Sequence, residues 1–246
     1  MNRYCYWLLN ENEQKIYTQI NDGITNLSSF IRTDITSKDN LSSIIRSVLT
    51  DHPQYFWFEG RVSAANEKDC IVVMPQYLYD CAEIKTAEQH IENVLLEIDC
   101  CQMANDYDKA KAAYDWLTEN VCYSIENGGQ NIHNALIERK AVCKGLSKAY
   151  QYLLLKLGVF STLTDGTIDG VARHIWNIVE IDGAYYNVDI SMRYSNFNYL
   201  FDGQQSIDKY RMFLKSDAEM KRTHKWYDSG CCPRLFCNRI YKKDVL

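Results

Sequence analysis

Apolar side chains recur every three or four residues in several stretches of the chain, and this spacing predicts a helix in each. The stretches are Glu13–Arg32, Leu41–Leu49, Thr86–Met103, Asp106–Asn120 and a shorter one within Gln130–Arg139. A further apolar stripe begins at Cys143, and Gly158 can close that helix as a C-terminal cap. The chain therefore contains several amphipathic helices, one of which starts with a thiol.

Strand-like runs separate these helices. Tyr55–Ser63 and Cys70–Tyr77 predict two strands joined by a turn at Asn66–Asp69. Residues 1–12 indicate a tail or an edge packed on the body. Between Thr162 and Arg173, two Asp-Gly pairs predict a loop above the site, where substrate choice could reside.

The dipeptide Asp182-Gly183 lies between two alternating runs, which is a strong signal for a two-residue β-hairpin. If the turn closes in this way, Ile181 lies opposite Ala184, and the other pairs follow outward. One face then carries His174 and Asp189 as diagonal neighbours, with backbones roughly 7–8 Å apart. An imidazole and a carboxylate at that separation can form a hydrogen bond.

A thiol, an imidazole and a carboxylate in this order can act as nucleophile, base and orienting group. Cys143 would lie in the first turn of its helix, where amide groups and the helix dipole lower the pKa of a thiol. Gly145 allows another backbone or a substrate to approach closely. We therefore expect a thiol active site.

The same residues resemble a known family. V-C-x-G at a helix start, followed by H-x-W-N-x-V-x-I-D-G-x-Y-Y-x-V-D, is similar to the pattern of the transglutaminase-like superfamily. That superfamily shares a papain-related core and includes transglutaminases, bacterial and archaeal proteases, and peptide N-glycanases. The resemblance implies Cys143 as nucleophile, His174 as base and Asp189 as the residue that orients the base. More loosely, the whole chain resembles bacterial transglutaminase-domain proteins through HPQYFWF (His52–Phe58) and FLKSDAEMKRTHKW (Phe213–Trp226).

Three more residues are candidates for an oxyanion site or a substrate groove. Gln130 offers an amide donor beside the Cys143 backbone N–H, although an amide that caps a loop is an equal alternative. Trp176 lies on the same strand face as His174, where it would shield the catalytic pair, line the groove or simply pack. Gly145 completes this set.

Composition limits the class of protein. The net charge of -5 argues against nucleic acid or an anionic membrane as the main partner. The resemblance implies a peptide or protein substrate. The chain holds ten cysteines and shows no signal peptide, so we expect free thiols, with packing as the role of nine of them. A cytoplasmic location follows if Met1 is the native start, and an exported one if a leader was removed.

Zinc is a weaker possibility at the C-terminal end. His224, Cys231, Cys232 and Cys237 could supply four ligands, but adjacent cysteines lack the usual C-x-x-C spacing. We expect no metal and no cofactor.

These observations together predict an α+β fold. Residues 1–104 would form a helper region of helices and a β-hairpin that shapes one wall of the cleft. Residues 105–246 would form a papain/transglutaminase-like core, with a helix carrying the cysteine packed on an antiparallel sheet carrying the histidine and aspartate. The expected function is cysteine-dependent acyl transfer on peptide amides, most simply proteolysis. The alternatives are a transglutaminase or deamidase, a glycan-releasing amidase, and a binding module with an idle triad.

Overall fold

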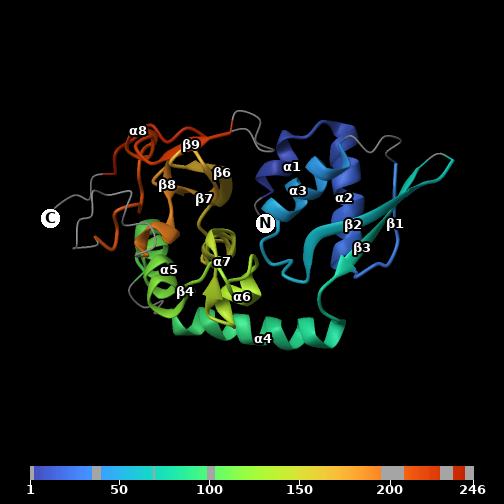
Figure 1. The fold of residues 1–246 in the computed structure, drawn as a ribbon, viewed down its shortest axis with the longest axis horizontal. Coiled ribbons are helices and arrows are strands. Elements are labelled where there is room, and N and C mark those ends of the chain that lie inside the picture. Colours follow the sequence, from blue (N-terminus) through green and yellow to red (C-terminus); the bar gives the residue numbers. More distant parts are fainter. Residues whose placement is uncertain are drawn as a thin grey trace. The chain divides into compact units, whose positions relative to one another are not determined.

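The computed structural model combines helices with antiparallel sheets in an α+β fold (Figure 1). It describes residues 3–34, 40–68, 70–98, 103–194, 208–227 and 235–241. Contacts divide the chain into two units, Met1–His90 and Ile91–Gly230 with Arg234–Leu246. The boundary falls inside helix α4 (Cys81–Glu97), earlier than the predicted boundary after residue 104. Whether the first region helps the second stays a prediction.

The first unit packs three helices with a three-stranded sheet. Its elements are α1 (Tyr4–Leu8), α2 (Glu11–Thr25), β1 (Ile31–Thr33), α3 (Leu41–Asp51), β2 (Phe58–Asn66) and β3 (Ile71–Tyr77). The strands run antiparallel in the order β1-β3-β2. The isoleucine and leucine stripes of α2 and α3 are buried, which is why both helices form where the periodicity predicts them.

Two predictions for this unit are wrong. Helix α2 ends at Thr25 rather than Arg32, since Leu27 adopts a positive φ and Ile31 pairs with Val73 in the sheet. The start of the chain was expected to be a tail or an edge packed on the body, and Tyr4–Leu8 instead forms a helix, α1, that packs on α3. The Asp51 carboxylate of α3 accepts hydrogen bonds from the first amides of α1, so the helix depends on a contact distant in sequence.

The second unit is built around α7 (Cys143–Lys156) and a four-stranded antiparallel sheet in the order β8-β7-β6-β9. The strands are β6 (Ser161–Ile168), β7 (Ala172–Ile181), β8 (Ala184–Val188) and β9 (His224–Trp226). Around them lie α5 (Asp106–Asn120), β4 (Cys122–Tyr123), α6 (Ile132–Leu136), β5 (Lys140–Ala141), η2 (Ile190–Arg193) and α8 (Asp217–Met220). Helix α7 packs on β7 and β6, and α5 and α6 pack on α7 (Figure 1). This confirms the predicted arrangement of a cysteine helix on an antiparallel sheet.

The predicted loop between Thr162 and Arg173 is instead mostly strand. β6 pairs with β7 from Ser161↔Val179 to Ile168↔Ala172, and Asp169 and Gly170 form the turn with positive φ. Gly166, which suggested a turn, lies inside the strand. A side chain at this position would collide with the Lys225 carbonyl of β9. Glycine therefore permits close strand pairing here.

The cysteines depart from the expectation of uniformly packed thiols. Cys5, which is buried on α1, is disulfide-bonded. Cys81 and Cys122 are free and exposed, so packing is the wrong prediction for them. Cys237 is free and buried, as packing requires.

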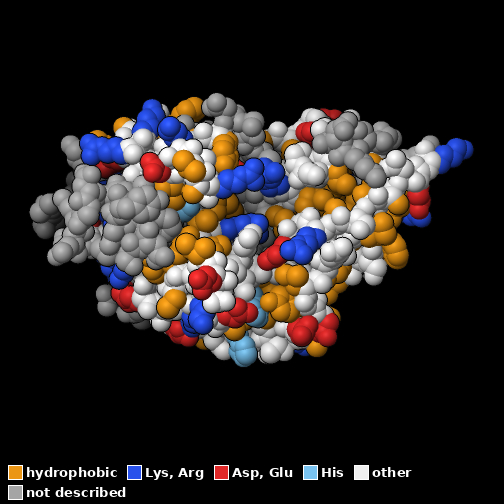
Figure 2. Space-filling view, viewed as in Figure 1, with side chains coloured by type: hydrophobic (Ala, Val, Ile, Leu, Met, Phe, Trp, Pro, Cys, Tyr) orange, Lys and Arg blue, Asp and Glu red, His pale blue; other side chains and the backbone are white. Residues whose placement is uncertain are grey.

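Charged side chains of both signs lie on the surface. On the face shown in Figure 2, acidic and basic side chains both occur among hydrophobic ones. None of the helices within the described residues is long and apolar enough to cross a membrane.

Candidate active site

Cys143 lies in the first turn of α7 and is partly exposed. Val142 precedes the helix in an extended conformation and its N–H donates to the Gly129 carbonyl, which fixes where the helix begins. The first amides of a helix have no acceptor within it, so they present positive dipoles beside the sulfur. The nucleophile candidate is thus accessible and lies where a thiolate is favoured.

The hairpin register agrees with the prediction made from Asp182-Gly183. Ile181 pairs with Ala184, and the ladder continues to Asn177↔Val188. Asp189 follows directly after β8 as the cap of η2. The predicted imidazole–carboxylate contact is confirmed, since His174 Nε2 lies 2.6 Å from Asp189 Oδ2 and both side chains are buried.

Cys143 interacts with the same imidazole through a hydrogen bond. The imidazole therefore connects a partly exposed thiol with a buried carboxylate. This is the order that a nucleophile, a base and an orienting group require.

The electrostatics of the pair favour ionised partners. Burial lowers the pKa of His174, but the charge and hydrogen bond of Asp189, assisted by Cys143, outweigh burial and raise the pKa to about 10. Burial also raises the pKa of Asp189, yet His174 and His224 outweigh it and hold that pKa well below its usual range. An imidazolium held next to the thiol stabilises a thiolate.

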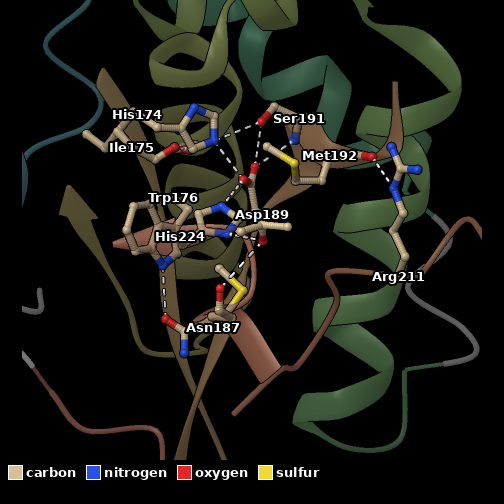
Figure 3. A network of polar contacts seen from close by, with 12 residues as sticks. His174, Ile175, Trp176, Asn187, Asp189, Ser191, Met192, Arg211 and His224 are labelled. Carbon is tan, nitrogen blue, oxygen red and sulfur yellow. Dashed lines mark hydrogen bonds and ion pairs between the residues drawn. The ribbon is translucent and has the colours of Figure 1, made fainter. Parts of the chain in front are cut away.

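Sequence reasoning missed two contacts of Asp189, which Figure 3 shows around the carboxylate. Ser191 donates to Oδ1 from its backbone N–H at 3.0 Å and from its hydroxyl at 2.6 Å. His224 Nε2 lies 2.9 Å from Oδ2. Continuing the hairpin pairs outward from Ile181 and Ala184 would bring Ser191 opposite His174, so this contact could have been found from the sequence. No local signal links His224 to Asp189.

The three remaining candidates occupy different environments. Trp176 is fully buried, and its indole N–H donates to Asn187 Oδ1 at 2.9 Å while its ring stacks near His174. Gly145 faces the carbonyl of Gly129, so its close approach is to backbone. Gln130 is exposed and accepts from Lys144 Nζ at 3.4 Å, next to the start of α7. Their predicted roles in an oxyanion site or a groove stay predictions.

Metal binding has one candidate cluster within the described residues. The ligand atoms of His174, Asp189 and His224 lie within 4.8 Å of one another. However, the two nitrogen–oxygen distances of 2.6 and 2.9 Å are shorter than the spacing of about 3.3 Å between ligands of tetrahedral zinc. Nitrogen–oxygen distances of this length are those of hydrogen bonds, in which the two atoms share a proton. Of the C-terminal zinc candidates, Cys231 and Cys232 lie outside the described residues, and His224 contacts Asp189 instead.

Residues 101–190 match the family model of the Transglutaminase-like superfamily. This segment is similar to the transglutaminase-like superfamily. The matched range contains Cys143, His174 and Asp189, and stops before Ser191 and His224. A comparison with curated proteins gave no match.

Solved structures give further similarities. A TGase matches at 13% identity and a TM-score of 0.41, covering 66% of this chain and 50% of that one. A candidate cysteine protease from Cytophaga hutchinsonii matches at 13% identity and 0.37, covering 53% and 61%. A candidate protease from Parabacteroides distasonis matches at 11% identity and 0.30, covering 53% and 39%. This chain thus spans between 39% and 61% of these proteins. Scores this low describe similarity only, so function rests on the geometry of the site.

Proposed function

We propose that the protein is a cysteine-dependent acyl-transfer enzyme that acts on amide bonds of peptides or proteins. The observation that carries the proposal is a partly exposed Cys143 thiol hydrogen-bonded to a buried His174, which in turn bonds Asp189 at 2.6 Å. The accessible sulfur can meet a substrate, while the buried pair keeps water from competing for the imidazole proton.

The reaction uses these groups in turn. The Cys143 thiolate attacks the amide carbonyl carbon, and the negative charge moves to the carbonyl oxygen. As the carbon–nitrogen bond breaks, His174 gives its proton to the leaving amine, and a thioester remains on the sulfur. Water then attacks the thioester while His174 accepts its proton, and the carbon–sulfur bond breaks, which releases the acid and restores the thiolate–imidazolium pair.

The negative oxygen of the intermediate needs donors. The backbone N–H of Cys143 is the first, since the opening amides of α7 have no acceptor within the helix. The side-chain amide of Gln130 is the second donor in this proposal. Two contacts hold Gln130 near the start of α7: the carbonyl of its neighbour Gly129 accepts from the Val142 N–H, and its own side-chain oxygen accepts from Lys144.

Hydrolysis, and therefore proteolysis, is the reaction we propose. An amine in place of water would give a cross-linking transglutaminase, and hydrolysis of a glutamine side chain would give a deamidase. Incubation of the protein with a peptide library, with and without an added primary amine, separates these by the mass of the products. Cleaved peptides support a protease, a gain of the amine supports a transglutaminase, and a gain of about 1 Da at intact glutamine supports a deamidase.

The first test needs no substrate. Limiting iodoacetamide at a pH of about 6 labels thiolates rather than thiols, so Cys143 should be labelled well before the exposed Cys81 and Cys122. In His174→Ala this preference should disappear, while near-ultraviolet circular dichroism reports whether the fold is kept. Slow and equal labelling of the three cysteines in the wild type would contradict an active thiol and favour a binding module.

A further inference from the structure

The Asp189 carboxylate is surrounded by donors from three parts of the fold (Figure 3). Oδ2 faces His174 at 2.6 Å and His224 at 2.9 Å. Oδ1 accepts the two hydrogen bonds from Ser191. A buried carboxylate held by several donors stays ionised and keeps one orientation.

His224 is built into this position. It begins β9, pairs with Ile168 of β6, and is almost fully buried. Its other ring nitrogen, Nδ1, lies 2.8 Å from the Thr223 hydroxyl, and its ring packs on the edge of Trp176 at 4.9 Å between centroids. An ionised carboxylate can only accept, so the ring nitrogen that faces Asp189, Nε2, carries a proton.

We propose that His224 is a positioning residue of the catalytic site, which donates from Nε2 to Asp189 Oδ2 and holds the carboxylate charged and aimed at His174. This inference rests on the proposed thiol chemistry of Cys143. The contacts then run from the Cys143 thiol through His174, Asp189 and His224 to the Thr223 hydroxyl. The second imidazole comes from β9, a strand that is distant from the hairpin along the chain.

The physical effect passes through Asp189. Without the donor on His224, the buried carboxylate loses part of the stabilisation of its charged form and one of the contacts that fix its orientation. A carboxylate that is less firmly aimed at His174 stabilises the imidazolium less, so the Cys143 thiolate is less populated at a given pH. Other titratable groups that act on this carboxylate are Tyr114 on α5 and Arg211, whose charge interactions stay in place in every variant below.

The experiment follows the rate of Cys143 alkylation by iodoacetamide against pH in three variants of the full chain. His224→Gln keeps an N–H donor at the end of a side chain of similar reach. His224→Leu keeps much of the volume and removes the donor. Met220→Leu is the packing control. Met220 is fully buried in the apolar cluster that contains Trp176, on which His224 packs, and its side chain has no hydrogen-bond donor for the triad.

We expect His224→Leu to slow alkylation at a pH of about 6 by roughly 10- to 100-fold, the loss typical of one hydrogen bond to a charged group. The acid limb of the profile should move upward by about one to two pH units. His224→Gln should retain most of the wild-type rate, and Met220→Leu should keep the wild-type profile. A rescue by glutamine distinguishes the donor from the volume of the ring.

The outcomes are separable. If wild-type Cys143 is no more reactive than Cys81 and Cys122, the proposed function fails and the role of His224 falls with it. If wild-type Cys143 is selectively alkylated but folded His224→Leu keeps the wild-type pH profile, the function stands and the inference is overturned. A uniform loss in His224→Leu, His224→Gln and Met220→Leu, with no movement of the acid limb, would show a packing role and also overturn it.

Discussion

Replacement of Asp189 with asparagine isolates the charge that holds His174. The two side chains have nearly the same size, so the substitution removes a negative charge and leaves the packing almost unchanged. The His174 pKa lies at about 10 against a usual 6.5, and at about 1.4 kcal/mol per pKa unit this is roughly 5 kcal/mol of imidazolium stabilisation. Burial opposes this stabilisation, and Asp189 is the largest of the groups that favour the imidazolium, ahead of Cys143. The loss expected in Asp189→Asn is therefore a large part of the total, on the order of 3 kcal/mol.

That energy translates into thiol reactivity. A loss of about 3 kcal/mol lowers the thiolate population by roughly 100-fold where the pair is the source of the thiolate. In Asp189→Asn, alkylation of Cys143 at a pH of about 6 should fall by that order and approach the rate of the exposed Cys122. Rate constants measured by peptide mass spectrometry across a pH series give both proteins' profiles in one assay.

Stability gives an independent reading of the same charge. Because the folded pKa of His174 is above its unfolded value, the stabilisation is fully present below a pH of about 6.5 and is lost as the pH rises through about 10. Urea denaturation should therefore show a larger loss of stability between those pH values in the wild type than in Asp189→Asn. Lysines and tyrosines titrate in both proteins, so the difference between them carries the result. Coincident alkylation profiles for the two proteins would refute the reasoning.

Three further substitutions test other parts of the structure. In Gly145→Ala the added methyl would lie 2.6 Å from the Gly129 carbonyl oxygen, so urea denaturation should show a loss of about 1–3 kcal/mol, and wild-type stability would contradict this close approach. In Gln130→Ala, kcat/KM on a peptide substrate should fall by roughly 100-fold with alkylation of the nucleophile unchanged, because alkylation forms no oxyanion; unchanged kcat/KM would remove Gln130 from the site. In Asp51→Ala, α1 and the Tyr17 hydroxyl lose their acceptor, and unfolding should become easier by about 2–4 kcal/mol, whereas equal denaturation midpoints would show that the contact adds nothing.

Local signals in the sequence were enough for much of the catalytic part. The apolar stripe after Cys143 and the glycine at its end defined α7, since both the period of a helix and its cap are local properties. Asp182-Gly183 set the hairpin register, and a two-residue turn leaves the flanking strands one pairing that keeps their apolar face buried. From that register the contact between His174 and Asp189 followed directly.

Contacts between distant segments were decided by the tertiary structure. Gly166 signals a turn by itself, but pairing with both β7 and β9 makes it part of a strand. Ile31 fits the helical period of α2, but its pairing with Val73 places it in a sheet. In both cases the backbone hydrogen bonds to another strand outweigh a local preference.

The surroundings of the carboxylate show the same division. The sequence by itself determined which thiol, imidazole and carboxylate could form a triad, because short-range periodicity and one turn fix their spacing. Only the folded chain decided that His224, 35 residues after Asp189, reaches the same oxygen atom. The reason is physical: β9 is placed by its pairing with β6 and by the burial of Trp176 and Met220 around it, and neither is encoded in the neighbours of His224 along the chain.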